Sequence, residues 1–115
     1  MRYATGGVYV AKYLLEVNYT IDGIKGVKAE GGSARVAAAT QLVESLGGTV
    51  ESFYFAFGGS DAYVVADFAD NVSAAAAGLA VSAGGGATTR TVVLLTAQEV
   101  DAAAGKQSTY RPPGR

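Results

Sequence analysis

The sequence predicts an α+β fold in which a four-stranded antiparallel sheet has its helices on one face. Two segments rich in aromatic and β-branched residues meet at a Gly-Gly-Ser turn over residues 58–60, which predicts a central hairpin. A helix-like segment with several alanines lies on each side of this hairpin, and another strand-like segment lies beyond each helix. The expected order is therefore β-α-β-β-α-β, followed by a short extra helix.

Residues 9–19 have the alternation of a strand that packs one face against the core. The residues expected on that core face are Tyr13, Leu15, Val17 and Tyr19. Thr20 then offers an N-cap for a short helix over residues 21–30, which Gly23 and Gly26 make weak because glycine disfavours helix interiors.

A second helix is expected over residues 34–46, where apolar residues recur at helical spacing. Its apolar face consists of Val36, Ala39, Leu42, Val43 and Leu46, whereas Arg35, Gln41 and Ser45 are expected elsewhere. Ser33 is the expected N-cap. Gly47 and Gly48 end the helix, because glycine readily takes the left-handed conformation found after a helix.

The hairpin consists of strands expected over residues 49–57 and 61–68. In the second strand the core face is expected to carry Ala62, Val64, Ala66 and Phe68. Asp70 and Asn71 then supply the start of an alanine-rich helix over residues 72–83.

The last strand is expected over residues 88–95. Thr96 and Glu99 have the spacing of a capping box, which predicts a short final helix that Gly105 stops. With all elements placed, the order is that of the ferredoxin-like split β-α-β arrangement.

The chain of 115 residues fits one domain, expected over residues 10–105. Residues 1–9 are expected to be a disordered N-terminal extension, because they are polar and contain glycine. Residues 106–115 are polar, contain two prolines and are expected to form an extended C-terminal tail.

Composition excludes several classes of function. The net charge of −1 gives no basic field for nucleic acid or for a membrane surface, and no apolar run reaches membrane-spanning length. We therefore expect no nucleic-acid or membrane partner, and a cytoplasmic location. The chain has no Cys and no His, which excludes thiol chemistry and leaves no favoured transition-metal ligand. No metal and no cofactor are expected, and no catalytic residue is identified.

An antiparallel sheet with helices on one face leaves its other face uncovered. This uncovered face is expected to carry Leu14, Glu16, Asn18, Tyr63, Val65 and Asp67. Strand 49–57 adds either Phe53, Phe55 and Phe57 or Val50, Tyr54 and Ala56, and the last strand adds either Arg90, Val92 and Leu94 or Thr91, Val93 and Leu95. Either choice is too apolar for solvent, so we expect a homo-oligomer, most simply a two-fold dimer with its sheets face to face.

The polar residues of the uncovered face are the candidate ligand-binding residues. Glu16, Asn18, Tyr63 and Asp67, together with Arg90, could line a pocket between two sheets. They could equally make hydrogen bonds between subunits and an ion pair, such as Arg90 with Glu16 or Asp67. If the protein is an enzyme, Glu16 or Asp67 could act as a base and Tyr63 as a proton donor.

Two further candidates lie in or beside the hairpin. Asp61 could be an acid at the mouth of a cavity, but an Asp at this point more simply closes a turn at the start of a strand. Tyr54 belongs to an aromatic stripe with Phe53, Phe55 and Phe57. The stripe could line an apolar pocket, although packing in a core or interface is the simpler interpretation.

Six segments spread along the chain resemble the GYD-domain proteins, which are small, mostly bacterial and without an assigned chemistry. These segments are residues 12–20 (KYLLEVNYT), 30–35 (EGGSAR), 44–48 (ESLGG), 53–61 (FYFAFGGSD), 67–71 (DFADN) and 110–114 (YRPPG). The family is named after a Gly-x-Tyr-Asp element. Residues 58–61 keep its Gly58 and Asp61, but Ser60 stands where the family has Tyr.

The resemblance also implies a type of assembly and of function. GYD-domain proteins are similar in fold to the dimeric α+β barrel superfamily, which implies a dimer and, in many members, a cofactor-independent oxygenase or isomerase. The sequence thus leaves three hypotheses: an oligomeric domain that binds a small molecule in a pocket between sheets, a cofactor-independent enzyme, or a structural assembly module.

Overall fold

The computed structural model describes residues 10–115, and the expected extension over residues 1–9 lies outside the described residues. In chain order the elements are β1 (Ala11–Tyr19), α1 (Ile21–Glu30), α2 (Gly32–Ser45), β2 (Thr49–Phe55), β3 (Ala62–Phe68), α3 (Asn71–Ala83), β4 (Ala87–Leu94) and α4 (Ala97–Ala104). The strands pair antiparallel in the order β2-β3-β1-β4. This is the strand order of the ferredoxin-like arrangement, so the predicted fold class is confirmed.

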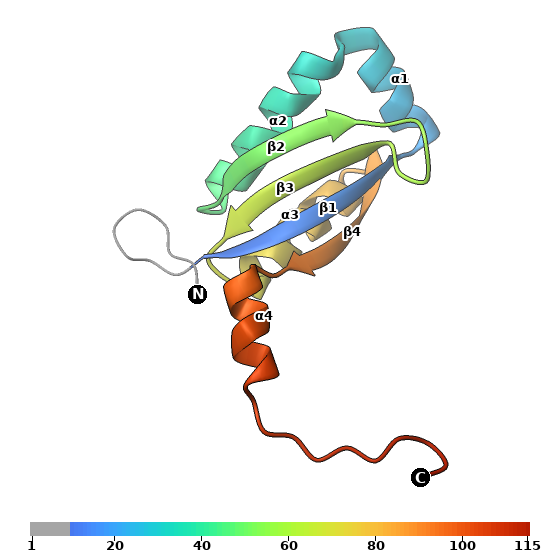
Figure 1. The fold of residues 1–115 in the computed structure, drawn as a ribbon. Coiled ribbons are helices and arrows are strands. Elements are labelled where there is room, and N and C mark those ends of the chain that lie inside the picture. The colour runs from blue at the N-terminus through green and yellow to red at the C-terminus, as the bar shows by residue number, and fades with distance from the viewer. Residues whose placement is uncertain (1–9) are drawn as a thin grey trace.

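The molecule has two layers. Figure 1 looks onto the uncovered face of the sheet, with α1, α2 and α3 behind it. Within the helical layer, α2 contacts the edge strand β2, and α3 contacts the opposite edge strand β4. The two helices therefore stand over opposite edges of the sheet rather than directly against each other.

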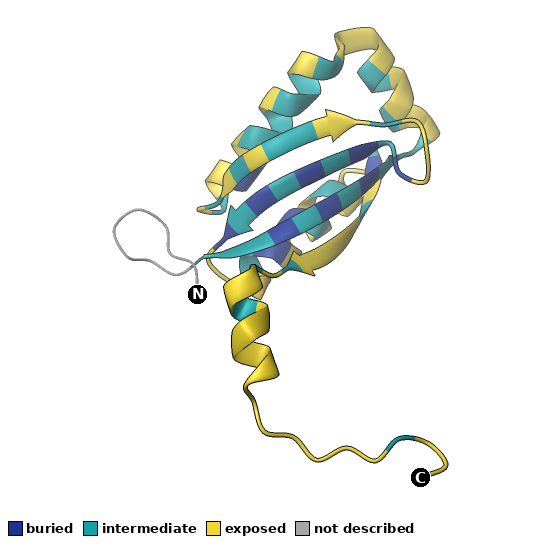
Figure 2. Cartoon of the chain, viewed as in Figure 1, coloured by how far each residue is buried: buried dark blue, intermediate teal, exposed yellow. Residues whose placement is uncertain are grey.

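The core lies between the helices and the two central strands. Figure 2 shows buried and half-buried residues alternating along β1 and β3, as expected for strands with one covered face. The predicted core faces are confirmed for Tyr13, Leu15 and Val17 of β1 and for Ala62, Val64, Ala66 and Phe68 of β3, whereas Tyr19 is half-buried. The Tyr13 and Phe68 rings meet edge to face, and the Tyr13 hydroxyl donates a hydrogen bond to Asn71 Oδ1.

Local capping signals placed most helix ends correctly. Thr20 caps α1 by accepting a hydrogen bond from the Gly23 backbone N–H at 3.1 Å, and Asp70 caps α3 through Ser73. The prediction of Ser33 as the N-cap of α2 is wrong. Gly31, at a φ of 87°, turns the chain directly from α1 into α2, so no side chain caps this helix.

The β2 strand is shorter than expected and contains a bulge between Val50 and Ser52. Both sets proposed for this strand, one with Phe53 and one with Tyr54, assumed that side chains alternate regularly between the two faces. The bulge interrupts that alternation, so neither complete set lies on one face. Val50 and Phe53 face the helices, whereas Tyr54 pairs with Tyr63 on the uncovered face. Phe57 lies beyond the end of β2 and is fully exposed.

The register of β4 decides which residues of the last strand lie on the uncovered face. Arg90, Val92 and Leu94 pair with Glu16, Leu14 and Lys12, respectively. Directly paired residues of an antiparallel sheet share a face, so this set lies on the uncovered face. Thr91 and Val93 of the alternative set pair with Leu15 and Tyr13 and face the helices, whereas Leu95 lies beyond the end of β4.

The C-terminal arm, defined as residues 97–115, projects from one end of the sheet (Figure 1). Thr96 and Glu99 form the predicted capping box at the start of α4, and Gly105 is the C-cap. No residue of α4 is buried, and the radius of gyration of 17.0 Å exceeds the value of about 13 Å expected for a compact chain of this length. Among the helices of residues 10–115, none has both the length and the hydrophobicity needed to span a membrane.

Candidate functional site

Four of the predicted ligand-binding residues form one row across the uncovered face. The register places Tyr54, Tyr63, Glu16 and Arg90 side by side on β2, β3, β1 and β4. The Arg90 Nε lies 3.6 Å from Glu16 Oε2, so one of the two anticipated ion pairs is present within a single chain. Strand alternation predicted Glu16 and Tyr63 on this face, whereas Tyr54 and Arg90 each belonged to one of two alternatives that the strand register decides.

A second polar group lies at one end of the same face. Lys12 Nζ donates hydrogen bonds to Glu51 Oε1 at 2.8 Å and to Asp67 Oδ1 at 3.0 Å. Burial lowers the pKa of Lys12, but these two hydrogen bonds outweigh it and raise the pKa above its ordinary value. Sequence reasoning missed Lys12, although it alternates with Leu14 and Glu16, and it could not find Glu51, which the bulge turns toward this face.

The remaining two candidates lie apart from the row. Asn18 pairs with Thr88 near the end of β1 that lies toward the hairpin turn. Asp61 Oδ2 accepts a hydrogen bond from the Tyr19 backbone N–H at 2.9 Å, and the Asp61 backbone N–H donates to Val17 O at 2.8 Å. Asp61 thus joins the hairpin turn to the end of β1, and it also borders an apolar hollow of about 490 Å³ beside α1.

Ser60, in the hairpin turn, is buried with only 1% of its surface exposed. Within the described part of the chain, its hydroxyl oxygen has no hydrogen-bond partner. A buried hydroxyl without a partner is unfavourable, so Ser60 adds no stability through its oxygen.

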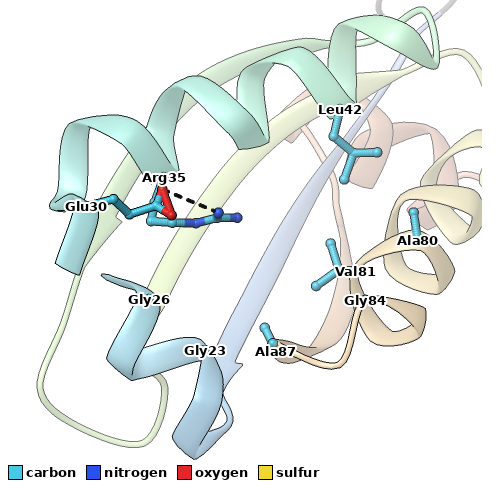
Figure 3. Close-up of a pocket in the computed structure, with 10 residues that line it drawn as sticks. Gly23, Gly26, Glu30, Arg35, Leu42, Ala80, Val81, Gly84 and Ala87 are labelled. Atoms are coloured by element: carbon cyan, nitrogen blue, oxygen red, sulfur yellow. Dashed lines mark ion pairs between the residues drawn. The ribbon is translucent and has the colours of Figure 1, made fainter. Parts of the chain in front are cut away.

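Another structural feature that sequence reasoning missed lies on the other side of the sheet. A hollow of about 380 Å³, here called the helix cleft, opens between α1, α2 and the end of α3 (Figure 3). It is lined by Gly23, Gly26, Glu30, Arg35, Leu42, Ala80, Val81, Gly84, Gly86 and Ala87. Most of these side chains are small, which is why helices over opposite edges of the sheet leave a space between them.

The helix cleft adjoins a narrower apolar recess of about 100 Å³ that reaches the sheet. The floor of the recess includes Leu15, Val17 and Val64, and its sides include Ala39 of α2 and Ala77 of α3. Arg35, Leu42 and Val81 line both spaces. Figure 3 shows Arg35 extending from α2 into the gap, with Leu42 and Val81 projecting into it from α2 and α3.

Arg35 carries the positive charge of the helix cleft. Its Nη1 lies 3.9 Å from Glu30 Oε2, a long single contact. Burial raises the pKa of the Tyr19 hydroxyl, and the charge of nearby Arg35 opposes that effect only in part. The sequence placed Arg35 away from the packed face of its helix. In the structure Arg35 is half-buried and lines the helix cleft, which begins where that packed face ends.

One wall of the helix cleft is a close backbone contact between α1 and the loop before β4. The Thr20 backbone N–H donates to Gly86 O at 3.0 Å, and the Thr20 hydroxyl donates to Gly85 O at 2.9 Å. A Cβ added at Gly23 would lie 1.7 Å from Gly86 O. Only glycine at position 23 permits this approach.

Within residues 10–115, no three carboxylates lie close enough together to share a metal ion. The helix cleft instead combines an apolar interior with one cation and one carboxylate at its mouth, which suits an organic molecule.

Comparison with known proteins gives one family and one solved structure. A family model for the GYD domain matches residues 13–104. Among solved structures, the chain is similar to the NE2512 protein of unknown function from Nitrosomonas europaea, with 22% identity and a TM-score of 0.43. The similarity covers 79% of this chain and 95% of that one. No curated protein matches the chain.

Proposed function

The chain belongs to the GYD domain family. We propose that it is a homo-oligomeric domain that binds a small molecule in the helix cleft. The observation that carries the proposal is the cleft itself, a hollow of about 380 Å³ next to an apolar recess. Small-molecule sites are typically concave spaces of about 300–1,000 Å³ with apolar walls and a few polar groups.

The packing of the helices supports binding rather than a closed core. Of α2 and α3, only Val43, Ala74 and Ala77 are buried, although both helices are rich in apolar residues. A domain that used this space only for stability would fill it with larger side chains, because protein interiors are close-packed. The unfilled space is available to a ligand.

The charges in the helix cleft favour binding over catalysis. Glu30 and Arg35 are the ionisable residues that line it, and they face each other. About half of the Glu30 side chain is open to solvent, so it is not set up as a desolvated base. The alternative of a cofactor-independent oxygenase or isomerase therefore finds less support than a binding domain.

The assembly part of the proposal rests on the uncovered sheet face. Leu14, Val65 and Val92 form an apolar strip across β1, β3 and β4. On either side of this strip, Glu16 is paired with Arg90, and Lys12 with Asp67, within the chain. A second copy can cover the strip without leaving an unpaired charge buried, which makes the face suited to a two-fold contact.

A pocket between two such sheets, lined by Glu16, Tyr63 and Asp67, requires the second subunit and stays a prediction. The same holds for the hypothesis of a purely structural module. Both hypotheses place the important contacts on the sheet face. A ligand bound in the helix cleft would therefore favour the present proposal over either of them.

The test is to locate ligand binding by NMR. Isotope-labelled protein is titrated with a panel of small acids, amides, amines and alcohols, and we expect amide shifts on α1, α2 and α3 around the helix cleft. Gly26→Leu should abolish these shifts, because position 26 lines the cleft and an added Cβ there meets no atom within 4 Å.

The matched control is Ala37→Leu, which adds the same side chain at an exposed position of α2. This variant should bind as the unmodified protein does. Shifts confined to the sheet face, or binding that survives Gly26→Leu, would contradict the proposal.

A further inference from the structure

The helix cleft has the chemistry of a site for one class of molecule. We propose that its ligand is a small carboxylic acid with a short apolar tail, whose carboxylate binds Arg35. This inference rests on the proposed function and adds the charge and the size of the ligand.

The position of Arg35 is the first step. Its side chain is 37% exposed, so most of it is covered by the walls of the cleft. Arg35 lines both the helix cleft and the apolar recess, and Figure 3 shows its side chain extending from α2 into the cleft. A guanidinium offers five N–H donors in a planar fork that matches the two oxygens of a carboxylate.

Arg35 interacts with the Tyr19 hydroxyl and with Glu30, and its ion pair with Glu30 is easily replaced. Glu30 makes one contact at 3.9 Å, and its side chain is 47% exposed. Exposed ion pairs of this kind contribute little free energy, because water competes for both groups. A ligand carboxylate that binds two guanidinium nitrogens at once contributes more binding free energy than the single Glu30 contact that it replaces.

The recess determines the rest of the ligand. Its walls are carbon-lined, with Leu15, Val17, Phe53 and Val64 on the sheet side. A cavity of about 150 Å³ with apolar walls accommodates benzene, so a recess of about 100 Å³ fits a tail no larger than a phenyl ring or a short alkyl chain. With its tail in the recess, the acid would present its carboxylate to Arg35.

The same geometry disfavours an amine. Glu30 is the carboxylate of the helix cleft, but it does not line the recess. An ammonium group bound to Glu30 would therefore sit at the outer mouth, where its apolar tail could not reach the recess past Arg35.

The experiment compares phenylacetate with phenylacetamide, a neutral ligand of nearly the same shape, by NMR titration at pH 7. We expect phenylacetate to bind the helix cleft roughly 10- to 100-fold more tightly, since a charge-assisted contact has about that effect on affinity. Arg35→Gln should remove this preference and leave phenylacetamide unchanged, whereas Arg35→Lys should keep part of it.

Arg90→Gln is the matched control, because Arg90 is also ion-paired but lies on the sheet face. It should leave both affinities unchanged. Equal binding of acid and amide in the helix cleft, or tighter binding of phenethylamine, would overturn the inference while leaving a ligand-binding domain intact. If no member of the panel shifts the cleft, both proposals are wrong. Should Arg35→Gln fail to fold, the ratio of acid to amide affinity in the unmodified protein decides alone.

Discussion

Two glycines of α1, three residues apart, have opposite surroundings. At Gly23 an added Cβ would lie 1.7 Å from Gly86 O, whereas at Gly26 it would meet no atom within 4 Å. Both lie in a helix, where glycine is less favourable than alanine. One glycine is therefore required by a tertiary contact, and the other is not required by packing within the chain.

We expect Gly23→Ala to lower the free energy of unfolding by about 1–3 kcal/mol, because α1 must move away from the loop before β4. Gly26→Ala should raise it by about 0.5–1 kcal/mol through helix propensity. Urea denaturation of the two variants measures both effects. Equal changes in the same direction would contradict the close contact at Gly23.

For individual residues, the sequence predicted the positions of side chains that alternate along a strand or cap a helix. It did not predict positions that depend on the spacing between elements. Glu16 and Tyr63 were predicted on one face because strand periodicity is local, whereas Arg90 stayed one of two alternatives until the register of β4 placed it there. Arg35 was not predicted in a cleft, because the sequence of a single helix does not determine its distance from a neighbouring helix. The bulge at Glu51 likewise left no signal that could be found in the strand pattern.

Among the elements, α3 depends on a charged cap. Asp70 Oδ1 accepts a hydrogen bond from the Ser73 backbone N–H at 2.8 Å. This hydrogen bond lowers the pKa of Asp70 below its ordinary value. A folded-state pKa below the unfolded one means that the carboxylate stabilises the fold above the unfolded pKa, and that this stabilisation is lost as the pH falls through the folded pKa.

We therefore expect Asp70→Ala to lower the melting temperature at pH 7, and the difference from the unmodified protein to shrink as the pH falls below about 4. Thermal unfolding followed by circular dichroism across this range measures the difference. Val72→Ala, an exposed and uncharged change at the second residue of α3, should give a difference that does not vary with pH. A constant difference for Asp70→Ala would contradict the charged cap.

The boundaries of the elements were mostly predictable because caps and turns are short-range. Thr20, Asp70 and Thr96 each precede a helix that begins where expected, within a residue. The start of α2 was not predictable, because Gly31 turns the chain through its backbone and Ser33, a good capping residue, lies inside the helix. The fold class survives such errors because it depends on the order of the elements.

For the whole molecule, the uncovered sheet face and the helix cleft lie on opposite sides of the sheet. Assembly and ligand binding can therefore be changed separately. Val92, which is 40% exposed in the single chain, lies on the apolar strip, whereas Val72 of α3 is 78% exposed and lies away from it.

We expect Val92→Lys to convert an oligomer into a monomer, because it would bring two like charges into a two-fold contact. Sedimentation velocity over a range of concentrations measures the change. Val72→Lys should leave the oligomer intact. A monomeric mass for the unmodified protein at all concentrations would contradict assembly through this face.

The contact between α1 and the loop before β4 also has a kinetic consequence. Its hydrogen bond from Thr20 to Gly85 joins residues 65 positions apart, so the chain must lose the entropy of a long loop before the contact forms. We expect this contact to form late in folding and to open early in unfolding. A ligand bound in the helix cleft would then hold α1 against the loop before β4, and its main effect would be a lower rate of unfolding.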